Sequence, residues 1–175
     1  MMNAVECAKQ AGFEIVRPVS ADMVVCSRDL RDLCNAEACN HYDTCWSCPP
    51  GAGSYEECVA RIAGKREGVL VQTLREGVDF DDAATLDRIR VLHNQRLDLL
   101  ADQLRSEHNG VLEFTTGGCD LCNPCSYPDA PCNMPERQRL ALSAHGVDVA
   151  ATCERSGMEY GFASGTIRFI GLVLL

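Results

Sequence analysis

The sequence has no excess of basic residues. Its 16 lysines and arginines are outnumbered by 25 aspartates and glutamates, which gives a net charge of −9. A protein that binds nucleic acid needs a basic face toward the phosphates. This composition therefore argues against a nucleic-acid partner.

Long apolar runs are also lacking. The most apolar stretch, IRFIGLVLL at the C-terminus, has nine residues and includes Arg168, whereas a membrane-spanning helix needs about 20. We expect a buried strand there and no membrane partner. The first residues, MMNAVECAKQAGFE, have neither the basic nor the apolar region of a secretory leader. These features predict a cytoplasmic protein.

Recognised catalytic motifs are missing as well. The chain contains no phosphate-binding loop, nicotinamide fingerprint or nucleophile-triad signature. Whether the protein is an enzyme stays open on this ground, and an electron carrier is favoured over a catalyst.

Helix and strand patterns alternate along the chain, which is typical of a layered domain. We expect one α/β (or α+β) domain over residues 1–175, with a small central sheet, flanking helices and two cysteine-rich loops at 34–50 and 117–135. Strands are predicted at 13–19, 69–74, 111–116 and 166–174. Helices are predicted at about 3–12, 54–67, 82–107, 136–144 and 148–157, with helix-capping residues at Asn3, Ser54, Asp82 and Asp148.

What the chain does have is 12 cysteines. In a reducing compartment such a number favours metal ligands or redox groups over disulfides. Eight of the cysteines fall in the two loops. The isolated ones are expected to be small buried apolar residues, with Cys26 as the most plausible substitute ligand; they are Cys7, Cys26, Cys58 and Cys153.

The second loop contains GGCDLCNPCSYPDAPC, with the spacing Cys119-x2-Cys122-x2-Cys125-x6-Cys132. Three cysteines in consecutive x2 steps suit three corners of a four-iron cubane, as in the ferredoxin run. Structural zinc sites usually pair two Cys-x2-Cys knuckles across a long spacer. Prolines around the ligands favour turns, and the glycines allow close backbone approach. The spacing favours an iron–sulfur cluster, with zinc or redox thiols as alternatives.

The first loop reads CNAEACNHYDTCWSCPP, with Cys34-x4-Cys39-x5-Cys45-x2-Cys48. This wider spacing leaves cluster and zinc almost equally favoured. Trp46 is expected to be a core aromatic that also shields the centre from water. His41 is an alternative ligand. The remaining histidines are interpreted as surface or helix-end residues; they are His93, His108 and His145.

The Trp-Ser-Cys-Pro-Pro ending of the first loop, followed by Gly-Cys-x2-Cys-x2-Cys-x6-Cys-x2-Pro, resembles the predicted metal-binding protein family known as domain of unknown function 2284. The similarity runs from about Cys34 through Gly146-Val147-Asp148-Val149 to the apolar C-terminal strand. It implies a metal-binding protein of a kind found mostly in anaerobic bacteria and archaea, with no settled reaction. The ligands that it implies are Cys34, Cys39 and Cys48, less firmly Cys45, and then Cys119, Cys122, Cys125 and Cys132.

Three functions follow as hypotheses. The first is an iron–sulfur protein with two [4Fe–4S] clusters that exchanges electrons with a redox partner protein. The second is a zinc-stabilised interaction module without redox activity. The third is an enzyme with an open metal site. The sequence does not place the two cysteine sets relative to each other.

Overall fold

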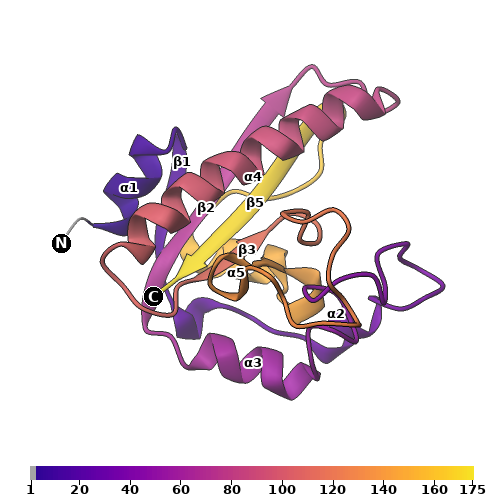
Figure 1. Ribbon diagram of the computed structural model, residues 1–175. Helices are drawn as coiled ribbons and strands as arrows, with labels where there is room; N and C mark the ends of the chain where they lie inside the picture. Colours follow the sequence, from indigo (N-terminus) through magenta and orange to yellow (C-terminus); the bar gives the residue numbers. More distant parts are fainter. Residues whose placement is uncertain (1–2) are drawn as a thin grey trace.

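The computed structural model describes residues 3–175 and shows a five-stranded mixed sheet with helices on both faces (Figure 1). This confirms the expected mixed α/β fold with a central sheet. The strands are β1 (Ile15–Ser20), β2 (Glu67–Glu76), β3 (Leu112–Thr115), β4 (Arg139–Ala141) and β5 (Thr166–Leu174). The helices are α1 (Ala4–Gln10), α2 (Arg28–Asp32), α3 (Tyr55–Ala63), α4 (Ala83–Arg105) and α5 (Val149–Ser156).

The strand order is β1-β2-β5-β3-β4, and every neighbouring pair except one is antiparallel. The exception is β3 with β4, which are parallel, with Phe114 opposite Leu140. Parallel neighbours need a long crossover connection, which is usually a helix. Here the second cysteine loop supplies that crossover. The pairing at the end of the sheet therefore fixes where this loop begins and ends.

Alternate side chains of the central strands enter two separate cores. Val69, Val71 and Val173 pack with α1 and α4 on one face. Leu70 and Leu172 point to the other face, where they pack with residues of α3 and α5. The C-terminal apolar run is therefore a buried strand, as its sequence predicts.

Capping residues set the starts of four helices, as expected. Asn3, Asp82 and Asp148 each accept a hydrogen bond from a backbone amide in the first turn. Ser54 forms a complete capping box with Glu57 at the start of α3. These bonds satisfy amides that a helix leaves without partners at its start.

The prediction of a helix over 136–144 is wrong. That segment forms a single 3₁₀ turn (Pro135–Arg137), then β4, then a second 3₁₀ turn (Ser143–His145). The free edge of β3 takes up residues 139–141 as a strand, which overrides the helical pattern. The helix that begins after Ser54 also ends earlier than expected, at Ala63, because β2 already starts at Glu67.

The longest helix, α4, is joined to the sheet edge by hydrogen bonds and ion pairs. Arg105 on α4 donates a 2.8 Å hydrogen bond to the carboxyl group of Glu113 on β3. Asp98 on α4 accepts a hydrogen bond of 2.9 Å from Arg139 Nε on β4, and Arg139 also pairs with Asp120 in the second cysteine loop. Within residues 3–175, no helix is both long and apolar enough to cross a membrane.

Glu113 makes stability depend on pH. Its side chain is fully buried. Burial, the hydrogen bond with Asp98 and the charge of Asp98 raise its pKa to about 8, although Arg105 acts in the opposite direction. The unfolded chain titrates this carboxyl near its ordinary pKa of 4.5. Between these values the folded state holds a proton that the unfolded state has lost, so stability falls as the pH rises.

We therefore expect the free energy of unfolding of the natural protein to fall by up to ~1.4 kcal/mol per pH unit as the pH rises toward about 8, measured relative to Glu113→Gln. Glutamine keeps the shape and has no charge to titrate. Urea titrations from about pH 6 to about pH 9 measure this difference. Glu67→Gln, at an exposed position, is the matched control. Parallel pH profiles for the natural protein and Glu113→Gln would contradict the assignment.

Candidate metal centre

The second cysteine loop brings its four thiols around one cavity. Cys119, Cys122, Cys125 and Cys132 all line it. The loop joins the parallel strands β3 and β4 and contains no helix or strand from residue 116 to residue 134. Its shape is therefore set by turns and by contacts with neighbouring segments.

The other lining residues suit a centre held by sulfur. Leu121, Met134 and Trp46 supply apolar walls, and the lining contains no histidine or carboxylate. Backbone amides of Leu121 and Arg139 donate hydrogen bonds to the sulfur of Cys119. Burial raises the pKa of the Cys119 thiol above its ordinary value. These amides and the Arg139 charge offset only part of that rise. Amides that donate to sulfur are one of the means by which proteins tune iron–sulfur centres.

The first cysteine loop lies between α2 and α3, and it holds a buried thiol pair. Cys45 is 5% exposed and Cys48 6% exposed. The thiol of Cys48 forms a hydrogen bond with Cys45, which lowers the pKa of Cys45 to about 5 and raises the pKa of Cys48. The pair therefore loses its first proton at a lower pH than an ordinary thiol does, and its second proton at a higher pH. Because thiolate is the ligand form of cysteine, one member of the pair is ready to bind a metal.

The other two predicted ligands of the first loop lie outside this pair. Cys39 is half-buried, and its charge adds to the rise in the pKa of Cys48. Cys34 lines an open hollow on the flank of the loop with Pro49 and Pro50. His41, the alternative ligand, is exposed. The structure thus brings Cys45 and Cys48 together, with Cys39 near enough to affect Cys48 electrostatically.

The two cysteine loops pack directly against each other, side by side at one end of the molecule (Figure 1). The backbone amide of Cys119 donates a 2.7 Å hydrogen bond to Ser47 Oγ. Ser47 is fully buried and its hydroxyl also lies 3.5 Å from Cys45 Sγ. Gly118 approaches so closely that a Cβ there would lie 3.1 Å from Cys48 Sγ. The expected close backbone approach is confirmed at this glycine.

Trp46 is the second bridge between the loops. Its indole nitrogen donates to the carbonyl of Ala130 at 3.0 Å, and its ring meets Tyr127 edge-on at 4.9 Å. The Tyr127 hydroxyl donates to Asp43 in the first loop. Trp46 is half-buried, and it lines the cavity of the four cysteines. It therefore covers the second loop's cysteines, although it belongs to the first loop.

The donor set fits a metal group bound by thiolates, and the shape of the site indicates how binding would proceed. The space between the second loop's cysteines is narrow, about 10 Å³, which is close to the minimum for one water molecule. Among residues 3–175, no three histidine, cysteine or carboxylate side chains are grouped so as to hold a single ion. A cluster would have to widen the loop, and a single ion would have to draw the thiols inward.

Comparison with known proteins supports the cysteine pattern. The model of the family described as "Predicted metal-binding protein (DUF2284)" matches residues 17–175. The chain belongs to this family. No curated protein and no solved structure matches the chain significantly. The match covers both cysteine loops of this DUF2284 protein and nearly all of its sheet.

The isolated cysteines of this DUF2284 protein lie outside the two loops in the sequence. Cys7, Cys58 and Cys153 are fully buried, as expected. Cys26 is half-buried and forms an isolated bridge with Val147. Burial and the neighbouring Cys58, which lies outside the first loop, raise the pKa of the Cys26 thiol.

The interpretation of the histidines as surface or helix-end residues is wrong for His93, which lies inside α4. His93 is 1% exposed and its Nδ1 contacts Thr73 Oγ1 at 2.8 Å. His145 ends the second 3₁₀ turn, as a helix-end residue would, but it is fully buried. Sequence reasoning also missed Ser47, whose one available signal is its place between two predicted ligands, and Arg139, which lies in a segment predicted as helix.

Ser47→Ala should lower the free energy of unfolding by about 1–3 kcal/mol, because the Cys119 amide would lose its partner in a buried site. Anaerobic urea titration measures this, with the fluorescence of Trp46, the one tryptophan of the chain, as the signal. Ser126→Ala is the matched control, since Ser126 is bonded within its own loop to the carbonyl of Pro131. Equal losses in both variants would contradict the bridging role of Ser47.

Proposed function

We propose that this protein holds two [4Fe–4S] clusters, one in each cysteine loop, and exchanges electrons with a partner protein. Cys119, Cys122, Cys125 and Cys132 would hold one cluster. The first loop would hold the other through Cys34, Cys39, Cys45 and Cys48. Bound clusters would supply one-electron redox chemistry, and the protein would set their potentials and exclude water.

The observation that supports this most strongly is the cavity lined by all four cysteines of the second loop. A cubane has ligands at four separate corners, so its cysteines must surround a space. Four-coordinate zinc needs its ligands to converge on one point. The x2-x2-x6 spacing of these cysteines and their arrangement around a space both favour an iron–sulfur cubane over zinc.

The packing of the loops supports electron transfer between two centres. Ser47 lies between Cys45 and Cys48 in the sequence and bonds to the amide of Cys119. Centres held in these loops would be neighbours within one small domain. Buried thiols, apolar walls and amides that donate to sulfur are features that set the potential of such centres.

Net charge supports one property of the partner. The chain carries a net charge of −9, and clusters bound by thiolates would add negative charge. Complementary charge speeds the encounter of two proteins and favours the correct partner. A redox partner with a basic docking face would therefore fit this protein.

Anaerobically purified protein should contain iron and acid-labile sulfide, with visible absorption that dithionite bleaches. Cys122→Ser and Cys48→Ser should each remove about half of the iron, because each breaks one four-iron site. Cys26→Ser is the matched control, since Cys26 lies outside both loops, and it should retain all of the iron.

A colourless preparation with stoichiometric zinc would contradict the proposal and would favour the structural-zinc alternative. Loss of all iron from each single variant, with the fold intact by circular dichroism, would indicate one shared site and would contradict the two-cluster arrangement.

A further inference from the structure

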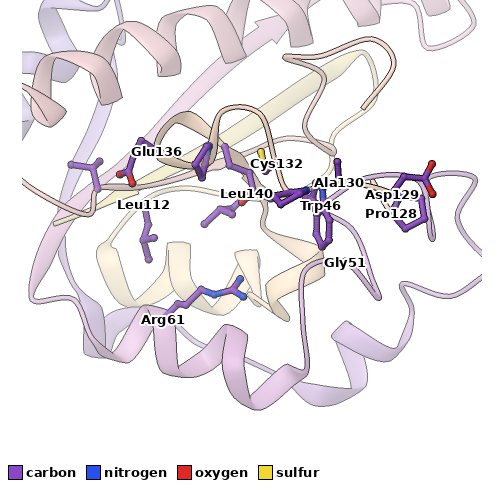
Figure 2. Close-up of a pocket in the computed structure, with 14 residues that line it drawn as sticks. Trp46, Gly51, Arg61, Leu112, Pro128, Asp129, Ala130, Cys132, Glu136 and Leu140 are labelled. Atoms are coloured by element: carbon purple, nitrogen blue, oxygen red, sulfur yellow. The ribbon is translucent and has the colours of Figure 1, made fainter. Parts of the chain in front are cut away.

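A second and much larger cavity lies beside the four cysteines. Its volume is about 560 Å³, within the range of small-molecule sites. Its walls come from α3, the start of β3, β4 and the far part of the second cysteine loop. Figure 2 shows Arg61 extending from α3 into this space, with Leu112 and Glu136 toward one end and Pro128 and Asp129 toward the other.

This cavity shares a wall with the cysteine cavity. Trp46, Cys132 and Gln138 line both spaces. A molecule bound in the larger cavity would therefore lie against one predicted metal ligand and against the tryptophan that covers the others. Such a molecule would be adjacent to the candidate metal centre without replacing any cysteine.

Arg61 is held in place by a buried histidine. His145 Nδ1 donates to the carbonyl of Ala141 at 3.0 Å, so a neutral ring presents Nε2 as an acceptor. Arg61 approaches that nitrogen at 3.3 Å. Burial lowers the pKa of His145 to about 4, which keeps the ring neutral beside the guanidinium. Within the described residues this is the one hydrogen bond of the Arg61 side chain, although the charge of Glu57, one turn earlier on α3, is close enough to interact with it.

The rest of the lining limits the charge and shape of a ligand. Val111, Leu112 and Leu140 form an apolar wall, together with prolines of the loop. Asp129 and Glu136 also line the cavity, so a second negative charge on the ligand would meet repulsion. One oxyanion on an apolar body suits this combination, because a guanidinium binds carboxylates through paired hydrogen bonds.

We propose that this cavity binds an organic monocarboxylate, with its carboxylate on Arg61 and its apolar body against Leu140 and Trp46. His145 is a positioning residue that acts through Arg61. The site goes beyond the electron-transfer function and does not depend on it, because none of the residues that hold the ligand is a predicted metal ligand.

Benzoate and hexanoate are suitable probes, with benzamide and hexanamide as neutral counterparts of the same shape. Added to the anaerobically purified protein, the acids should bind by calorimetry and change the fluorescence of Trp46, whereas the amides should bind at least about 10-fold more weakly. Arg61→Gln should weaken binding of the acids by a similar factor. Arg66→Gln, an exposed arginine that does not line this cavity, should leave binding unchanged.

Several results would overturn the proposal: no binding of either acid, equal binding of acids and amides, or tighter binding of inorganic phosphate than of benzoate. Metal content is measured on the same samples. Acid binding that persists in a preparation without iron would leave this site standing while contradicting the iron–sulfur function. Full iron content without acid binding would contradict this site and leave the iron–sulfur function standing.

Discussion

The contact between the backbone of Cys119 and the buried hydroxyl of Ser47 is the interaction on which the candidate site depends. It joins a loop that follows α2 to a loop that follows β3, more than 70 residues later in the chain. Gly118 lies against Cys48 at the same place, and no larger residue would fit there without displacing a sulfur. Two cysteine sets that are separate in sequence thereby become one structural unit.

The sheet and α4 hold this unit in position. The second loop takes the place of the helix that usually connects parallel strands, so both of its ends are fixed by the pairing of β3 with β4. Arg139 joins this edge to Asp98 on α4 and to Asp120 within the loop. Its backbone amide also bonds to the sulfur of Cys119. Arg139 thus links α4, the edge strand β4 and a candidate ligand.

Much of the fold could be predicted from the sequence, because its signals are local. Capping residues gave the starts of α1, α3, α4 and α5, and the apolar run at 166–174 gave β5. The segment around Arg139 could not be assigned in this way. Its strand exists only because β3 has a free edge, and pairing between distant segments leaves no local pattern. The burial of His145 could not be predicted from the sequence for the same reason.

The candidate site shows the same division. The cysteine spacing predicted which thiols share a loop, and the structure places all four cysteines of the second loop around one cavity. Spacing could not indicate that Trp46 of the first loop would cover the second loop's cysteines, since this depends on the contact of the two loops. The position of the Arg61 side chain could not be predicted either, because it depends on a contact with a buried histidine 84 residues away.

Electron paramagnetic resonance of the anaerobic, fully reduced protein tests the central claim, that the two loops form one unit with two neighbouring metal centres. If they do, two reduced clusters in one small domain should give a broadened spectrum from interacting spins, with about two spins per chain. The spectrum of Cys122→Ser should narrow to that of one isolated cluster. Two sharp, independent signals in the natural protein, or no signal at any potential, would contradict this account.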